Sequence, residues 1–347
     1  MLELYVFTRD RALLGAVEAF EYLRWSRRYS HCGSFELKAI ATPENTELLR
    51  LGHYLWKNDD EEAGLIEFRE LAAPDRETIL VSGRFATSFL ARRIIWGTET
   101  LNGDLSDCVE QLMDNHLIDP DDPTRCIPGI TFSSPALDIP IRTQTSYRNL
   151  LDVVTGLCDT AEVGIKTVFD PTGGPLNVRL YQGGVTQAVF SKEYENIIDQ
   201  IYTQSLMDYA NTALIGGEGE GSDRVFAAIT GEAGEDRYEM FVDAKDLREE
   251  DFGVEYEDAL LFRGDAKLQE RAMIRAFDAS ANPYGNLVYK SDYDLGGVVK
   301  VLSTRWNLEM TARITEIEES YDADGRSLRV VFGKPTLTLI QKLKGDF

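Results

Sequence analysis

The hydrophobic pattern of this chain changes period twice, and this change constrains the fold more than any single motif does. In residues 1–99, short runs such as AFEYLRWSRRY and SFELKAIAT alternate apolar with polar side chains, which is typical of β-strands. In residues 100–195 the apolar spacing becomes helical, and from residue 196 onward short β-type runs return. The sequence therefore predicts a mainly β protein with α/β modules (α+β), in which two β domains flank an α/β module.

The domain boundaries should follow these changes of period. A chain of 347 residues is long for one hydrophobic core, since domains usually hold roughly 100–200 residues. We expect an N-terminal β domain over residues 1–99, built as a sandwich or small barrel, and an α/β module over 100–195. A C-terminal β domain should cover 196–347, with a helical insertion near 244–283.

Capping and turn residues locate individual elements within this plan. Thr42 and Pro43 suit the N-cap and first position of a short helix. The segments LSDCVEQLMDNHLI and SYRNLLDVVTGLCDTAEVG are amphipathic helices by their spacing, and Ser146 is the expected N-cap of the second. The turn at 171–174 should join two strands, and DAKLQERAMIRAFDAS predicts a further helix over 265–280.

The glycine-rich stretch ALIGGEGEGSDRVF, residues 213–226, raises the question of phosphate binding. A phosphate loop needs backbone N–H groups and a helix N-terminus to converge on the anion. Here the glycines are followed by another strand-like run, no Lys-Ser or Lys-Thr pair follows them, and Glu218 and Glu220 would place negative charge where phosphates sit. The stretch is better interpreted as a flexible hairpin or bulge.

Other catalytic and metal-binding patterns are equally weak. The four cysteines and three histidines are scattered, and the adjacent pair His31-Cys32 is best explained as a turn before a strand. The chain has no G-x-S-x-G or H-E-x-x-H motif, and its 59 acidic residues do not nominate a catalytic pair. The segments SDYDLGG and SYDADGRS hold only fragments of a calcium loop. We expect no enzyme activity, no cofactor and no metal.

The charge of the chain excludes some classes of partner. With 36 basic and 59 acidic residues, the net charge is −23, which repels nucleic acid and anionic membranes at the level of the whole surface. The N-terminal segment lacks a basic leading region, and no apolar run reaches the roughly 18 residues of a membrane span. We therefore expect neither membrane insertion nor secretion.

Several segments, in order along the chain, resemble one family. LRWSRRYSHCGSFELKAIATPENTELLRLGHYL, AGLIEF and VSGRFATSFLARRII resemble the N-terminal half of tail-tip or baseplate hub proteins of siphophages and prophages. QTSYRNLLDVVTGLCDTAEVG is similar to the central helix of that family. SDYDLGGVVKV and ARITEIEESYDADGRSLRVVFG are similar to its C-terminal signature.

This resemblance implies a hub fold with two β-barrel-like domains, assembled as a homotrimer in the virion tail. Such a protein docks on the distal tail protein ring, with the tape measure protein or tail fibres as further neighbours, and forms the channel through which DNA leaves without specific binding. An acidic channel would prevent DNA from sticking. The acidic segment KDLREEDFGVEYED could line the channel or lie on the outer face, and we favour the outer face.

Two groups of residues are candidates for specific roles. Trp25, Arg27 and Arg28 could anchor a subunit or ring interface, because Trp and Arg are enriched at such anchors; equally, Trp25 could face a barrel interior with the arginines solvated. The second group should shape a turn and consists of Asp292, Asp294, Gly296 and Gly297. The alternative functions are a peptidoglycan hydrolase with an unrecognised carboxylate pair and a carbohydrate-binding tail module using exposed Trp96 or Trp306.

Overall fold

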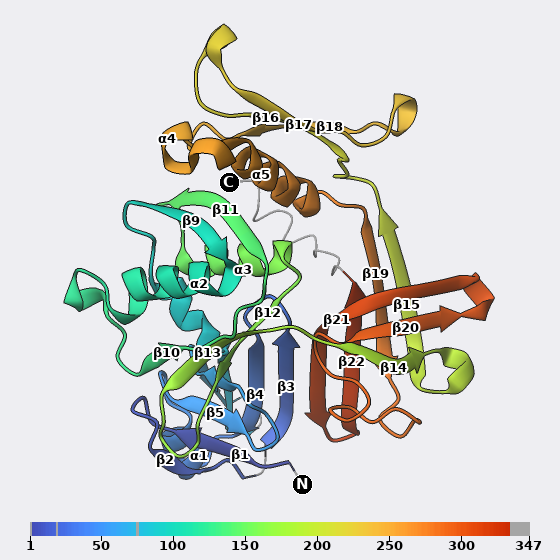
Figure 1. Cartoon of the computed structure of the whole chain (residues 1–347). Helices are drawn as coiled ribbons and strands as arrows, with labels where there is room; N and C mark the ends of the chain where they lie inside the picture. The colour runs from blue at the N-terminus through green and yellow to red at the C-terminus, as the bar shows by residue number, and fades with distance from the viewer. Residues whose placement is uncertain (1, 19, 74–75, 334–347) are drawn as a thin grey trace.

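Strands from both ends of the chain form one large sheet in the computed structural model, which describes residues 2–18, 20–73 and 76–333. The N-terminal part contributes β3 (Phe20–Arg28), β4 (Ser34–Ile40), β7 (Phe68–Ala72) and β8 (Thr78–Arg84). The later part contributes β14 (Val185–Phe190), β15 (Ile197–Ser205), β19 (Ile274–Ala281), β20 (Val298–Ser303), β21 (Leu308–Asp322) and β22 (Gly325–Gly333). Figure 1 shows the two groups of strands meeting in the lower half of the molecule.

The junction between the two groups is the pairing of β3 with β21. The sheet runs in the order β15-β19-β22-β21-β3-β4-β8-β7, with β20 also paired to β21 and β14 paired to β20. The antiparallel β3–β21 register extends from Arg28 opposite Glu316 to Leu23 opposite Tyr321. The long strand β21 therefore links the two β regions through main-chain hydrogen bonds.

This pairing corrects the expectation of separate, barrel-like β domains. The path of the large sheet ends at β15 and β7, and no closed barrel forms within the described ranges. Each β region covers an exposed strand edge by pairing with the other, which removes the need for closure within one region. The mainly β class is confirmed, whereas the boundaries after residues 99 and 195 stay a prediction.

A smaller four-stranded sheet packs beside the N-terminal strands, and its order is β2-β1-β5-β6. It consists of β1 (Leu4–Phe7), β2 (Leu13–Ala16), β5 (Tyr54–Lys57) and β6 (Ala63–Leu65). The short helix α1 (Pro43–Leu48) precedes β5, and the Asn45 N–H donates to the Thr42 hydroxyl at 3.0 Å. The predicted N-cap of this helix is therefore confirmed.

The middle of the chain forms the α/β module, and its helices bury one apolar face each. The elements are β9 (Thr98–Asp104), α2 (Leu105–Met113), β10 (Ile130–Phe132), β11 (Pro140–Ser146), α3 (Leu150–Thr160), β12 (Gly164–Val168) and β13 (Leu176–Tyr181). Leu112 and Val154, from α2 and α3, lie fully buried in one core. The N-cap of α3 is Asn149, whose side chain accepts from the Leu151 N–H at 3.0 Å, and the predicted cap Ser146 instead ends β11.

An insertion between β15 and β19 forms the uppermost layer in Figure 1. It comprises β16 (Thr212–Gly216), β17 (Phe226–Ile229), β18 (Glu239–Asp243), α4 (Glu249–Phe252) and α5 (Tyr256–Glu270). The helix predicted over 265–280 is wrong in its second half, because Ile274–Ala281 is β19, with Phe277 and Ala279 buried in the sheet core. The helical segment begins earlier than expected, within the acidic stretch.

The glycine-rich stretch forms a hairpin, as the sequence predicted. Strands β16 and β17 pair antiparallel, with Gly216 opposite Phe226. Between them, Gly219 has φ +96°, a left-handed conformation that favours glycine. No helix N-terminus follows the glycines, since the chain continues through the short 3-10 turn Gly221–Asp223 into β17.

Short 3-10 and π segments connect several of these elements. The short segments are η1 (Ala86–Arg92), η2 (Asp114–Ile118, a π-helix), η3 (Pro123–Arg125), η4 (Lys192–Tyr194), η6 (Gly234–Asp236), η7 (Gly253–Glu255) and η8 (Thr304–Trp306).

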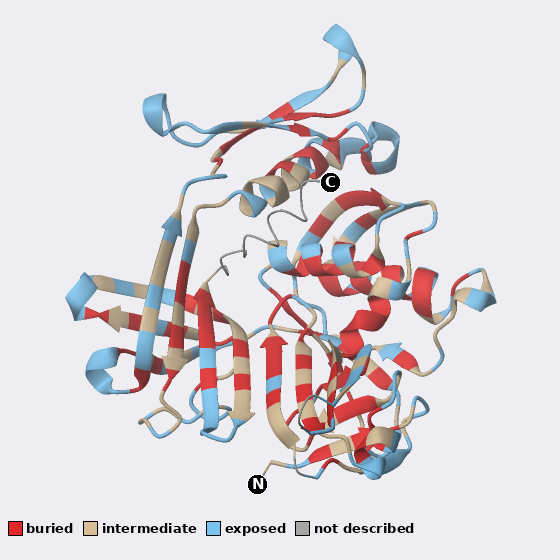
Figure 2. Ribbon diagram, turned by 180° about the vertical axis from the view of Figure 1, so that it is seen from behind, coloured by how far each residue is buried: buried red, intermediate tan, exposed pale blue. Residues whose placement is uncertain are grey.

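Figure 2 shows buried residues concentrated in the large sheet and the α/β module, and exposed residues at the hairpin tips of the insertion. Over the described residues, none of the helices combines the length and apolarity that a membrane span requires.

Candidate functional site

The two groups of residues chosen from the sequence meet at the junction between β3 and the C-terminal strands. Arg27 Nη1 donates to Asp294 Oδ1 at 2.8 Å and to the Tyr289 hydroxyl at 2.9 Å. Arg27 Nε lies 3.6 Å from Asp60 Oδ2, and the Arg27 side chain is only 8% exposed. One arginine thus connects β3, the loop between β5 and β6, and the turn before β20.

Trp25 is fully buried beside Arg27, which agrees with the alternative in which it faces inward, but Arg27 is buried rather than solvated as that alternative expected. Its Nε1 donates to Asp60 Oδ2 at 2.9 Å, and its ring lies 4.6 Å from that of Phe85 between centroids. Arg28 Nε donates to Glu316 Oε2 at 2.9 Å across the β3–β21 pairing. The structure therefore uses all three residues inside the chain, and a contact with another subunit stays a prediction that only Arg28, 35% exposed, is placed to make.

A second ion pair lies in the same junction and is completely buried. Lys57 Nζ, at the end of β5, is 3.0 Å from Glu319 Oε1 of β21, and both side chains are 0% exposed. Glu319 Oε2 also accepts from Arg326 Nη2 at 2.8 Å and from the Tyr321 hydroxyl at 2.6 Å. Burial, the largest single influence, lowers the pKa of Lys57. The charges of Glu319, Asp60 and Asp59 together raise this pKa by more, so the net shift is upward. Lys57 therefore stays charged.

Glu62 places a third buried acid close to Arg27. Burial, followed by the charge of Asp60, raises the pKa of Glu62 to about 8, and Arg27 opposes this shift. A carboxyl group in this position is therefore largely protonated at neutral pH. Sequence reasoning missed Lys57, Glu62 and Glu319, because polar residues at strand ends are usually solvated; a charged residue at an inward position of an alternating strand was the available signal.

The predicted turn residues do shape turns in the structure. Asp292 Oδ2 accepts from the Val288 N–H at 2.7 Å, and the Gly297 N–H donates to the Asp294 carbonyl at 3.0 Å. Gly296 has φ +83°, and a Cβ there would lie 2.3 Å from Tyr29 Cε2. In the described part of the chain, no group of at least three His, Cys, Asp or Glu residues could hold a metal ion.

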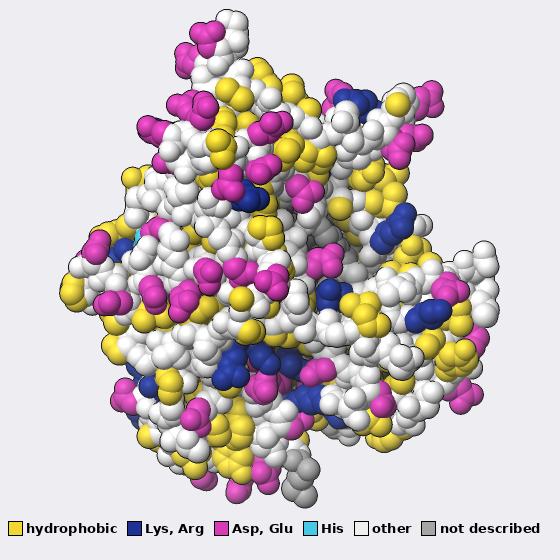
Figure 3. Space-filling view, in the orientation of Figure 1, with side chains coloured by type: hydrophobic (Ala, Val, Ile, Leu, Met, Phe, Trp, Pro, Cys, Tyr) yellow, Lys and Arg dark blue, Asp and Glu magenta, His cyan; other side chains and the backbone are white. Residues whose placement is uncertain are grey.

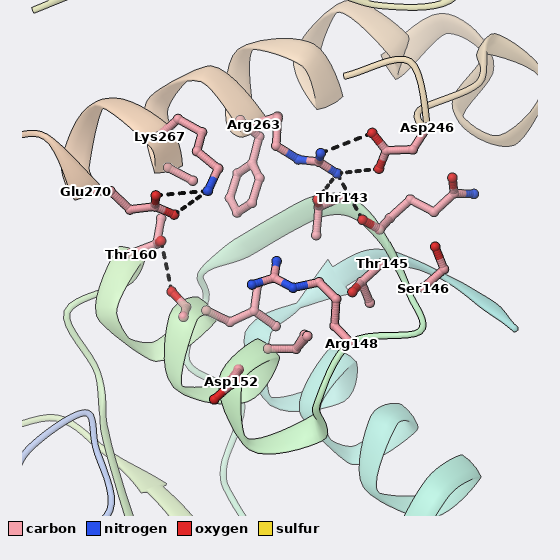
Figure 4. Close-up of a pocket in the computed structure, with 16 residues that line it drawn as sticks. Thr143, Thr145, Ser146, Arg148, Asp152, Thr160, Asp246, Arg263, Lys267 and Glu270 are labelled. Atoms are coloured by element: carbon pink, nitrogen blue, oxygen red, sulfur yellow. Dashed lines mark hydrogen bonds and ion pairs between the residues drawn. The ribbon is translucent and has the colours of Figure 1, made fainter. Parts of the chain in front are cut away.

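A pocket of about 280 Å³ lies where α5 crosses β11 and α3. Figure 4 shows Arg263 and Lys267 of α5 on one wall and Arg148 and Asp152 on the other. Arg263 Nη2 donates to the Gln144 carbonyl at 2.9 Å and lies 2.9 Å from Asp246 Oδ2, while Lys267 pairs with Glu270 at 2.7 Å. Of these contacts, the Arg263 hydrogen bond to Gln144 of β11 ties the insertion to the α/β module, whereas the two ion pairs lie within the insertion.

The histidines and exposed tryptophans belong to separate parts of the fold. Buried His116 has its Nε2 3.0 Å from Glu99 Oε1, and burial lowers its pKa. Trp96 follows η1 and is 56% exposed, with the Arg125 guanidinium 4.2 Å from its ring. Trp306, 45% exposed, lies in η8. Each of these three side chains has a local partner, which is Glu99 for His116, Arg125 for Trp96 and the Phe277 ring for Trp306.

The complete architecture matches that of solved prophage tail proteins. The 43 kDa tail protein of prophage MuSo2 from Shewanella oneidensis aligns with TM-score 0.65 and 16% identity, covering 96% of this chain and 98% of that one. A tail protein from Neisseria meningitidis aligns with TM-score 0.62 and 12% identity, covering 96% of each chain. A prophage tail protein from Listeria monocytogenes gives TM-score 0.62 and 10% identity, covering 99% of this chain and 97% of the other. The fold is therefore of the prophage tail protein class.

The sequence itself assigns the family within this class. Residues 3–334 match the family model of the Siphovirus ReqiPepy6 Gp37-like proteins, and the chain belongs to that family. No curated protein matches this chain in sequence. The resemblance to siphophage and prophage tail-tip proteins that the motifs indicated is confirmed.

Proposed function

We propose that this protein is a structural hub at the distal end of a siphophage or prophage tail. In this proposal it assembles as a homotrimer, docks on the distal tail protein ring, and surrounds the channel through which DNA leaves. Membership of a siphovirus family and a prophage tail protein fold over nearly the whole chain support the proposal.

The observation that carries the proposal is the single sheet built from both ends of the chain. A hub subunit must hold its shape while tail and tip components pull on it. The β3–β21 pairing, reinforced by the buried Lys57–Glu319 pair, joins the N-terminal and C-terminal strands into one unit. Such a unit should resist pulling forces better than β regions joined only by linkers would.

The acidic surface supports the channel part of the proposal. Figure 3 shows acidic side chains spread over the face in view, whereas Lys and Arg gather near its middle. With a net charge of −23, three copies around a channel would present a field that repels the phosphates of DNA. Each avoided Lys or Arg contact to phosphate removes affinity that would slow the passage of DNA. The tape measure protein or tail fibres are the further neighbours we expect.

Reconstitution with the tail ring tests this function. The purified chain is mixed with the distal tail protein of the same phage, and the mixture is fractionated by size and imaged by electron microscopy. We expect a complex with three copies of this chain on one face of the ring. A ring that never carries this chain, together with virions whose tails lack it by mass spectrometry, would contradict the proposal.

A further inference from the structure

A cluster of arginines lines one pocket in this otherwise acidic molecule. Arg9 and Arg11 come from the turn between β1 and β2, and Arg92 and Arg93 come from the end of η1. Together with Tyr54 of β5 they line a cavity of about 500 Å³, here called the arginine pocket. Segments distant in sequence thus bring like charges together around one cavity, where exposed Arg9 and Arg92 can be reached by an anion from solvent and Arg11 is half-buried.

The charges of the arginine pocket are not neutralised by ion pairs. Among the described residues, no Asp or Glu lies within 4.0 Å of the guanidinium groups of Arg9, Arg11 or Arg92. Asp10 also lines the pocket, but within the described part of the chain it forms no ion pair with these arginines. The acid that acts most strongly on Arg92 is Glu67, which Arg84 engages through two hydrogen bonds of 2.8 Å.

Arg11 is held in a strained conformation that directs its guanidinium toward the pocket. Its φ is +65°, which is costly for a residue with a side chain, and its N–H donates to the Thr8 carbonyl at 2.9 Å. The guanidinium lies against Gly129, where a Cβ would come within 2.6 Å of Arg11 Nη2. Arg11 Nε is buried without a hydrogen-bond acceptor among the described residues. A buried donor without an acceptor is expensive, and an oxygen atom of a ligand would satisfy it.

Tyr54 and Arg92 complete the set of donors around the cavity. The Arg92 guanidinium stacks 4.3 Å from the centroid of the Phe89 ring, which fixes its plane. Burial raises the pKa of Tyr54, while Arg11, Arg92 and Arg9 each lower it. Because Tyr54 and the three arginines line the same pocket, hydroxyl and guanidinium N–H groups can donate to the same ligand.

We propose that the arginine pocket binds an oxyanion, either a phosphate group or the carboxylate of an acidic segment. Guanidinium groups match both anions by paired, parallel N–H···O bonds, which gives specificity in addition to charge. The net charge of −23 disfavours anions over the surface as a whole, so an anion needs a local cluster of positive charge such as this one. The site stands independently of the proposed function in the tail.

Calorimetric titration of the full chain with inorganic phosphate, and separately with a triglutamate peptide, tests the site at constant ionic strength. The site variant is Arg11→Gln/Arg92→Gln. The control variant is Arg179→Gln/Arg305→Gln, which removes the same charge from exposed arginines for which the structure shows no ion pair within its described part. Melting temperatures of all three proteins without ligand verify that each is folded.

We expect saturable binding of at least one probe by the wild-type and control proteins and at least a tenfold loss of affinity in the site variant. The probe that binds identifies phosphate or carboxylate as the source of the anion. Absence of saturable binding of both probes to the wild-type protein, or equal losses in the site and control variants, would overturn the inference.

Discussion

Arg27 of β3 donates to the carboxylate of Asp294 at 2.8 Å, and this contact joins residues 267 positions apart in the chain. The same guanidinium lies 3.6 Å from Asp60, so it stands between two acids. Arg27 is therefore one of the cations that hold the junction of the two β regions together, beside the buried Lys57. The consequences of this arrangement can be measured.

Removal of the Arg27 charge should destabilise the fold strongly. In Arg27→Met, Asp60 keeps only the more distant Lys290 Nζ at 3.9 Å and the Trp25 hydrogen bond. Breaking a buried pair typically costs about 3–5 kcal/mol, and we expect a loss toward the lower end of this range. The matched control is Arg28→Met on the same strand, which loses a partly exposed contact to Glu316 worth about 1 kcal/mol or less. Urea unfolding of both variants measures the difference, and equal losses would refute a special role for Arg27.

Lys57 and Glu319 should behave as an energetically coupled pair. Each single change, Lys57→Met or Glu319→Leu, leaves a buried charge without its main partner and should lower the free energy of unfolding by several kcal/mol, about 3–5. The double variant should lose less than the sum of the two, with a coupling of about 0.5–3 kcal/mol. A double-mutant cycle by denaturant unfolding checks this, and strict additivity would show that the pair does not interact.

Glu62 should make stability depend on pH in a defined window. Its pKa rises from an ordinary 4.5 to about 8 in the folded chain, so its contribution is complete below pH 4.5 and is lost as pH increases to about 8. Glu62→Gln removes this loss, because the amide cannot ionise. The stability of the variant relative to wild type should therefore increase between these pH values and level off above them. Thermal unfolding of both proteins at several pH values measures this difference. A difference in melting temperature that stays constant from pH 4.5 to about 8 would contradict this reasoning.

Gly296 should resist substitution more than its neighbour does. Gly296→Ala forces a side chain into φ +83° and against Tyr29, which should cost more than about 1 kcal/mol. Gly297 has no positive φ, and a Cβ added there would lie 3.0 Å from the Asp294 carbonyl oxygen, so the cost of Gly297→Ala should be smaller. Thermal unfolding of the two alanine variants compares them directly, and the reverse order would contradict the assigned turn geometry.

Local structure was predictable where one short pattern determines it. Alternation located β3 and β4, helical spacing located α2 and α3, and the glycine-rich stretch was correctly assigned to a hairpin. The C-terminal boundary of α5 was not predicted correctly. The segment IRAFDASA has helical residue types, but it pairs with β15 and β22 as a strand of the large sheet. Tertiary pairing overrides local propensity at such positions.

The junction could not be predicted because it depends on pairings distant in sequence. Arg27 and Asp294 were each selected, for different reasons, yet nothing local indicated that they touch. The burial of Lys57 and Glu319 follows from the β3–β21 pairing, which replaces closed barrels by one shared sheet. The arginine pocket depends in the same way on a close approach of the first turn of the chain to η1.

The mass of the purified protein in solution, measured by light scattering over a range of concentration and salt, tests the central claim most directly. A hub that surrounds a channel requires a closed ring of subunits, so we predict a species of about three times the 39.0 kDa chain mass. That species should become dominant as concentration increases. A strict monomer at every concentration, both alone and with the distal tail protein, would contradict the account.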